Sequence, residues 1–132
     1  EFQDGSGDNC GEINSNATSN TTTYGTSSDH RLKENVTDVT GAIDTVKLLQ
    51  PRTYNFISDP DDTPQNGFIA HELAAIVPNA VTGEKDAVKE DGSIKPQQVD
   101  YGLVTPILTA ALKEAIAKIE TLETKVAALE AN

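Results

Sequence analysis

Residues 105–130 read TPILTAALKEAIAKIETLETKVAALE, and this stretch decides much of the fold. Its large apolar residues recur at alternating steps of four and three, which is the repeat of a coiled-coil seam. In heptad notation, Leu112, Ile119 and Val126 occupy a positions, and Leu108, Ala115, Leu122 and Leu129 occupy d positions. The pattern therefore predicts one long C-terminal helix that associates with other helices along this seam.

The positions that flank the seam carry complementary charges. Lys118 and Lys125 occupy g positions, whereas Glu123 and Glu130 occupy e positions. In a parallel assembly the g residue of one chain faces the e residue of the next heptad in its neighbour, so Lys118 meets Glu123 and Lys125 meets Glu130. Each such pair contributes only roughly a few tenths of a kcal/mol when exposed, but both favour parallel self-association.

Two features of this helix stay open in the sequence. Isoleucine or valine at a with leucine at d favours two strands, but Ala115 at d and Ile116 at e weaken that rule, so both dimer and trimer remain. The helix could also pack its apolar residues against its own domain. At its start, Asp100 can cap a helix, and Pro106 either kinks the helix or lies in the first turn of one that restarts at Thr105.

Residues 28–99 have the composition of a small globular domain. We expect, in chain order, an amphipathic helix through Val36, Val39, Ile43 and Val46, a strand at 52–57, a loop at 58–66, a strand at 67–69, a helix at 70–77 and a charged hairpin at 84–99 that turns at Asp91-Gly92. Pro51 ends the first helix, and Pro96 confines the hairpin to a sheet edge or an isolated ribbon. The fold class is α+β: a small mixed domain with a β-hairpin arm, followed by the coiled-coil helix at 100–132.

Residues 1–27 differ from the rest in composition. Asn, Thr, Ser and Gly dominate them, and the large apolar residues Phe2, Ile13 and Tyr24 are too sparse to close a core. One interpretation is a flexible tail. The other is the end of a larger fibrous protein whose strands pair only in an assembly. The chain thus has three parts: 1–27, 28–99 and 100–132.

Charge and composition exclude several classes of function. The formal net charge is −11, from 10 basic and 21 acidic residues, and such a surface repels nucleic-acid backbones. The chain has no apolar run near the roughly 20 residues of a membrane span. Its single cysteine and its two histidines, His30 and His71, match no metal-site spacing. We therefore expect no nucleic acid, membrane, metal or cofactor as a partner.

Ser28 and Lys33 are a candidate nucleophile and base. A lysine can deprotonate a hydroxyl when burial or neighbouring cations such as Arg31 disfavour its charged form. A bend in the five-residue step between them would bring the amine to the hydroxyl. A serine that follows a peptide bond can attack the preceding carbonyl, so that the acyl group moves from nitrogen to oxygen and water cleaves the ester. On spacing alone, an ordinary polar loop is the simpler interpretation.

Three stretches in a fixed order give this pair a context. They are SDHRLKENV at 28–36, GFIAHEL at 67–73 followed by VPNAV at 77–81, and VDYGLVTPIL at 99–108. Together they resemble the endosialidase-type intramolecular chaperone auto-processing domain, which lies at the C-terminus of phage tail spikes and tail fibres. The resemblance runs from Ser28 to Asn132. His71 stands where the family often has glutamine, and we expect it to be a partly buried helix residue without a catalytic role.

The resemblance implies a parallel homotrimer that gathers three upstream fibre chains, helps them to fold, and then cuts itself off between Ser27 and Ser28. Ser28 would be the nucleophile and Lys33 the base of a single-turnover serine endopeptidase, with Asp29, Arg31 and Asn35 in support. Assembly would take place in the host cytoplasm, residues 1–27 would stay with the virion fibre, and the chaperone would be released. The alternatives are a permanent, non-cleaving fibre tip, with or without receptor binding, and a hydrolase that acts on other substrates.

Overall fold

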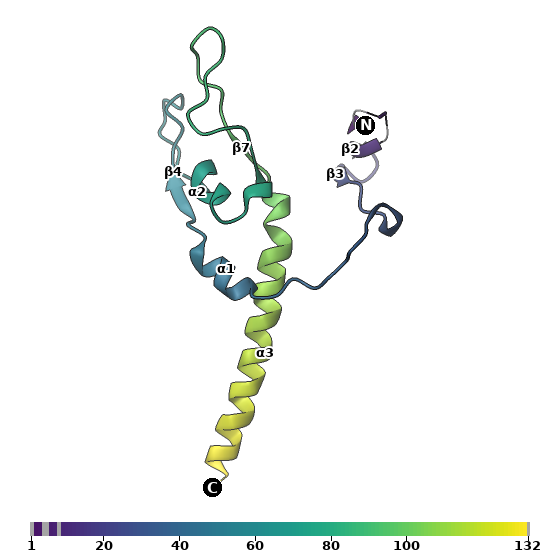
Figure 1. Ribbon diagram of the computed structural model, residues 1–132, viewed down its shortest axis with the longest axis vertical. Helices are drawn as coiled ribbons and strands as arrows, with labels where there is room; N and C mark the ends of the chain where they lie inside the picture. Colours follow the sequence, from purple (N-terminus) through teal and green to yellow (C-terminus); the bar gives the residue numbers. More distant parts are fainter. Residues whose placement is uncertain (1, 4–5, 8, 132) are drawn as a thin grey trace. The chain divides into compact units, whose positions relative to one another are not determined.

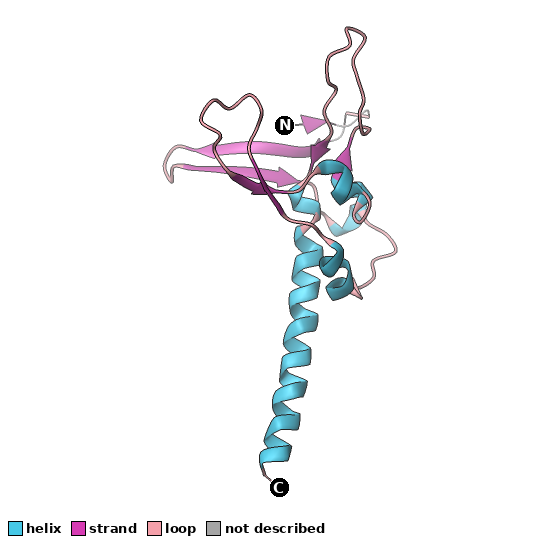
Figure 2. Ribbon diagram, turned by 90° about the vertical axis from the view of Figure 1, so that its left-hand side faces the viewer, coloured by secondary structure: helices cyan, strands magenta, loops and turns pink. Residues whose placement is uncertain are grey.

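The computed structural model describes residues 2–3, 6–7 and 9–131. The chain divides into two compact units, Glu1–Asp38 and Val39–Asn132. Small sheets, short helices and one long C-terminal helix make up these units, as Figure 2 shows. The expected α+β class is therefore confirmed.

The first unit is built on a three-stranded antiparallel sheet in the order β1 (Phe2–Gln3), β2 (Asn9–Asn16) and β3 (Thr21–Thr26). The Asn16 side chain stabilises the β2–β3 turn, because its Oδ1 accepts hydrogen bonds from the amides of Thr18 (2.9 Å) and Ser19 (3.2 Å). Pairing takes place within one chain. In the described residues these segments form strands that pair within one chain, which neither interpretation of residues 1–27 predicts.

This sheet has little core of its own. Phe2, Ile13 and Tyr24 are 56%, 50% and 79% exposed, and every residue of β3 is exposed. A small sheet without a covered face is marginal in water. The sheet therefore offers apolar surface and an open edge along β3 for further packing.

The second unit contains two two-stranded sheets and three α-helices (Figure 1). Strand β4 (Arg52–Tyr54) pairs with β5 (Gln65–Gly67), and β6 (Val81–Thr82) pairs with β7 (Gln98–Val99), both antiparallel. The helices are α1 (Ala42–Leu48), α2 (Ala70–Ala74) and α3 (Thr105–Glu130), and 3₁₀ turns lie at η2 (Pro78–Ala80) and η3 (Tyr101–Leu103).

Helix α1 is shorter than the sequence pattern predicts. Gly41 precedes it with a positive φ of 68°, a conformation that glycine adopts freely. Val36 and Val39 lie upstream of this residue, outside the helix, and are 81% and 53% exposed. The three-and-four spacing of these valines was therefore misread as helix.

The hairpin of β4 and β5 also differs from expectation. Pairing of Arg52 with Gly67 and of Tyr54 with Gln65 places β5 two residues earlier than the predicted strand. Phe68 and Ile69 thus lie outside the strand and lead into α2. Phe68 packs against the buried core, so its apolar character reflects burial and not strand pairing.

The core of this unit joins α2 to the start of α3. Leu73, Val77, Ala80 and Val104 are its buried residues, each at most 4% exposed. Helix α1 packs on the next turns of α3, where Ala42 and Ala111 are buried. These contacts fix the first half of α3 within its own domain.

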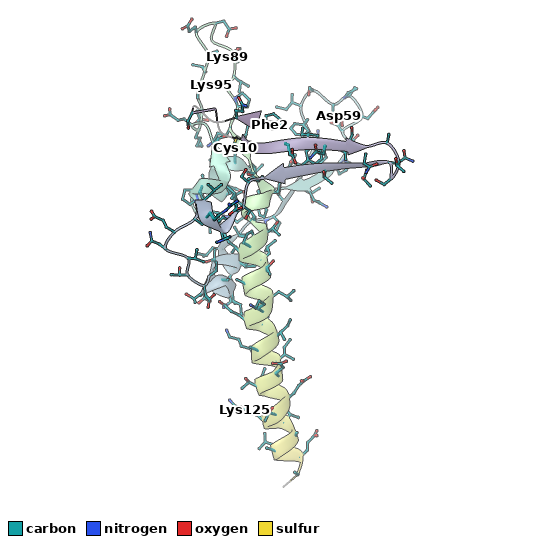
Figure 3. All side chains as sticks on the ribbon, turned by 90° about the vertical axis from the view of Figure 1, so that its right-hand side faces the viewer. Phe2, Cys10, Asp59, Lys89, Lys95 and Lys125 are labelled. Carbon is teal, nitrogen blue, oxygen red and sulfur yellow. The ribbon has the colours of Figure 1, made fainter. Side chains whose placement is uncertain are left out.

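The predicted charged hairpin is present above this core. Val88 and Ile94 form an antiparallel bridge, and the chain turns through Gly92, which has a φ of 79°. Lys89 and Lys95 project from this arm in Figure 3. Strands β6 and β7 close its base, so the arm is an extension of the domain and not part of its core.

Helix α3 begins at Thr105, with Pro106 in its first turn, which is one of the two starts that the sequence allows. Asp100 caps η3, with its Oδ1 accepting from the Gly102 amide at 2.8 Å. No kink at the proline is needed, because its missing N–H lies where a helix leaves amides unpaired.

The large apolar residues of the α3 seam are exposed, whereas Ala115 within it is partly buried. Exposure is 47% at Leu108, 62% at Leu112, 54% at Ile119, 59% at Leu122, 50% at Val126 and 75% at Leu129. In Figure 1 the C-terminal half of α3 extends past the other described elements of its unit. Packing of this seam against its own domain is therefore the wrong interpretation. In the described part of the chain, none of the helices, α3 included, has the length and hydropathy to cross a membrane.

Candidate active site

The peptide bond between Ser27 and Ser28 lies at the junction of two anchored segments. On its N-terminal side, the Ser27 amide extends the sheet by donating to the Cys10 carbonyl at 3.1 Å. On its C-terminal side, Asp29 caps the 3₁₀ turn η1 (His30–Leu32). Both ends of the bond are thus positioned by local structure within the first unit.

The turn η1 brings the two candidate side chains together. The Leu32 amide donates to the Asp29 carbonyl at 3.1 Å, and the Lys33 amide donates to the His30 carbonyl at 3.2 Å. This reversal places Lys33 Nζ 2.6 Å from Ser28 Oγ. That separation lies within the range for proton transfer between a nucleophile and its base.

An ion pair holds the turn in shape. Arg31 donates two side-chain hydrogen bonds to the Asp29 carboxylate, from Nε at 2.9 Å and from Nη2 at 2.7 Å. The Arg31 amide also donates to Asp29 Oδ1 at 2.9 Å. The side-chain bonds from Arg31, followed by the amide bond, lower the pKa of Asp29. Asp29 therefore stays a carboxylate that fixes the turn, and we assign it no proton transfer.

Asn35 shapes the exit from this segment. Its φ is 54°, in the left-handed region that asparagine tolerates better than most residues with a side chain. Asn35, like Asp29 and Arg31, is thus placed to set the backbone path and not to react.

The Ser28 and Lys33 side chains are exposed in the single chain. An amine accepts a proton only in its uncharged form, and removal from water favours that form. In the single chain, Ser28 and Lys33 therefore have the spacing that general-base chemistry needs, but not the water-free surroundings. A surface that covers the pair would complete the site.

A hollow of about 180 Å³ adjoins the same peptide bond on its N-terminal side. Its lining is Gly11, Glu12, Gly25, Thr26 and Ser27. Sequence reasoning missed Glu12, because only the pairing of β2 with β3 shows that it lies near residue 27. A carboxylate can take a proton from a water molecule beside it.

The described residues contain no group of three or more His, Cys, Asp or Glu side chains placed to hold a metal ion. His71 lies in α2 with its side chain exposed, so the expectation of partial burial was wrong. The neighbouring Glu72 instead accepts two hydrogen bonds from Arg52, at 2.9 and 2.8 Å, which tie α2 to β4.

Comparison with known families gives one match. Residues 28–82 match the model of the peptidase S74 family, described as chaperone of endosialidase. The match covers less than half of the 132 residues: it starts at Ser28, includes Lys33, and ends with β6. The family name denotes a peptidase family. No curated protein matches the chain.

Proposed function

Because residues 28–82 match the family model described as chaperone of endosialidase, we propose that this chain is the self-releasing chaperone of a phage tail fibre or spike. Three copies associate in parallel through α3, guide the folding of the chain upstream of Ser28, and then cut the bond between Ser27 and Ser28. The carrying observation is the 2.6 Å separation of Lys33 Nζ and Ser28 Oγ directly after that bond.

Self-association is supported by the uncovered seam of α3. Six large apolar side chains lie along it, each between 47% and 75% exposed. Full burial of one such side chain contributes about 1.5–3 kcal/mol, so the seam provides a strong driving force for pairing with other copies. Three heptads alone are marginal, and the packing of α1 and the core on the first half of α3 adds rigidity.

The cleavage chemistry follows from the position of Ser28. Lys33 takes the hydroxyl proton, and Ser28 Oγ bonds to the Ser27 carbonyl carbon. The carbon–nitrogen bond then breaks, and the nitrogen leaves as an amine with the proton returned by Lys33. Ser27 is now joined to Ser28 Oγ as an ester, and water hydrolyses this ester to a new carboxyl end at Ser27.

Assembly is proposed to switch on this chemistry. In one chain the pair is exposed, and water stabilises a charged amine. A neighbouring copy that covers the pair removes water and favours the uncharged base. Cleavage is then tied to assembly, which prevents release before three chains have been gathered.

The order of events has a kinetic reason. Fibre chains held together by long-range β-pairing fold slowly and aggregate readily. A helical seam raises the local concentration of the chains and sets their register. Loss of the chaperone afterwards leaves the fibre protected by its unfolding barrier. The hairpin arm at 84–99 is proposed to contact the fibre chains during this process, in the host cytoplasm, while residues 1–27 remain in the virion.

The test is the intact mass of a chain extended upstream into the fibre, in the wild type and as Ser28→Ala and Lys33→Ala. Ser27→Ala is the matched control, because it alters the adjacent hydroxyl but keeps the proposed nucleophile. We expect cleavage in the wild type and the control, and full-length chains in the other two. If all four remain full length as assembled trimers, the chain is a permanent fibre tip.

A further inference from the structure

We propose that Glu12 is the general base for the second half of the cleavage, the hydrolysis of the ester between Ser27 and Ser28. This inference rests on the proposed function and assigns a base to the water that attacks in its second step. The residue lies upstream of the bond, in the part that the chaperone would leave behind.

Strand register brings Glu12 to the bond. Glu12 pairs directly with Gly25 across β2 and β3, and Cys10 lies opposite Ser27 through the hydrogen bond from the Ser27 amide. Residues two apart on a strand share a face, so Glu12 and Ser27 are diagonal neighbours on one face. Such neighbours lie about 7–8 Å apart at Cα, within reach of a long side chain.

Glu12 lies opposite a glycine, which has no side chain to cover its stem. A Cβ built on Gly25 would be in ordinary van der Waals contact with Glu12 Cγ, at 3.5 Å, so the Glu12 stem lies beside this glycine. The hollow of about 180 Å³ that Glu12 shares with Ser27 is large enough for several water molecules. Glu12 is also partly covered, in a sheet whose third strand is exposed throughout.

The other side chains at the junction are less suited to this step. Thr26 and Ser27 line the same hollow, but neutral hydroxyls are poor bases. Asp29 is bound by the Arg31 guanidinium through both carboxylate oxygens. Lys33 points to Ser28 Oγ, the leaving oxygen of the ester, and is thus placed for the first step.

The step balances with water as the only co-reactant. The Glu12 carboxylate takes one proton from water while the water oxygen bonds to the Ser27 carbonyl carbon. The bond from that carbon to Ser28 Oγ breaks, and the oxygen leaves with the proton from Glu12. The products are a carboxyl group at Ser27 and a free hydroxyl and amine at Ser28.

The experiment uses the upstream-extended chain as an assembled trimer, with Glu12→Gln as the test variant and hydroxylamine as the probe. Hydroxylamine cleaves esters and leaves a hydroxamate at the new C-terminus, which mass spectrometry identifies at Ser27. We expect Glu12→Gln to form the ester at the wild-type rate but to hydrolyse it at least roughly 100-fold more slowly, so that the ester accumulates. Ser28→Ala should give no hydroxamate.

Two further variants separate chemistry from structure. Glu34→Gln removes another acid next to Lys33 and should cleave like the wild type. Glu12→Asp keeps a carboxylate on a shorter stem and should hydrolyse the ester at an intermediate rate, and it serves as the readout if Glu12→Gln does not assemble.

The outcomes distinguish this inference from the proposed function. Wild-type cleavage with unchanged hydrolysis in Glu12→Gln overturns the role of Glu12 alone. A trimeric Glu12→Gln chain that forms no ester also overturns it, because the residue would then act before or during the first step. A wild type that assembles but never cleaves overturns both.

Discussion

The two halves of α3 share one apolar pattern but have different surroundings. The N-cap residue Val104 and, in the first half, Ala111 are buried, at 2% and 7% exposure, by α1, α2 and the neighbouring turns, although the seam residue Leu112 is 62% exposed. In the second half, Ile119 and Leu122 are more than half exposed. A helix can therefore be stabilised by its own domain at one end and depend on other copies at the other, and mutations in the two halves should have different consequences.

The largest expected effect is in the exposed half. Ile119→Glu places a charge at an a position of the seam, where every assembled chain would have to bury it. We expect light scattering coupled to chromatography to show monomers. Cleavage of the upstream-extended chain should fall by roughly 100-fold or more. Ala117→Glu, on the same helix but outside the seam, is the control and should assemble. A trimeric Ile119→Glu chain would contradict the seam.

Mutations in the buried core of the second unit should lower the free energy of unfolding. Leu73 is 2% exposed at the centre of the core, so Leu73→Ala should lower the free energy of unfolding by about 2–5 kcal/mol. Leu48→Ala, at a leucine that is 60% exposed, should lower it by about 1 kcal/mol or less. Chemical denaturation followed by circular dichroism measures both. Equal losses would mean that the core is not where the structure puts it.

A third effect tests the contact between Gly67 at the end of β5 and Tyr101, which lies just before α3. A Cβ at Gly67 would clash with the Tyr101 hydroxyl and lie 2.9 Å from the Tyr54 hydroxyl. Gly67→Ala should therefore cost about 1–3 kcal/mol of stability. Adding Tyr101→Phe removes one of the two oxygens and should restore part of the loss, although it also removes the hydrogen bond from the Phe68 amide. Thermal unfolding of the single and double variants measures both effects. If the stability losses of Gly67→Ala and Tyr101→Phe simply add, the two residues do not clash.

The sequence predicts the features that depend on local pattern. The long C-terminal helix and the turn at Gly92 follow from periodicity and turn chemistry, and both are present. The bend between Ser28 and Lys33 also forms, and it is held by an ion pair of Asp29 and Arg31, two residues to which the motif gives a supporting role.

Features that depend on distant partners were missed. Val36 and Val39 have helical spacing, yet α1 starts only after Gly41, where Glu114 on α3 binds the first amides of the helix. Glu12 gains its place beside Ser27 only through strand register. Neither partner can be identified from neighbouring residues in the sequence, because 72 positions separate Ala42 from Glu114.

The smallest expected effect concerns this link between α1 and the covered half of α3. The Glu114 carboxylate accepts hydrogen bonds from the amides of Ala42 (2.9 Å) and Ile43 (3.0 Å), and these bonds lower its pKa below the usual value of 4.5. A lowered pKa in the folded state adds stability above pH 4.5, and this stability is lost as the pH falls through the folded pKa. Glu114→Gln should therefore unfold at a slightly lower temperature than the wild type at pH 7, with the difference shrinking toward pH 3.

Glu120→Gln, at an exposed glutamate farther along α3, is the control for the general effect of removing one negative charge. Its unfolding temperature should follow that of the wild type at both pH values. If Glu114→Gln and Glu120→Gln respond alike, the carboxylate does not hold α1. If only Glu114→Gln shows the pH-dependent loss, α1 is held to α3 by charge-assisted bonds to its first amides. That link fixes the start of α1 on α3.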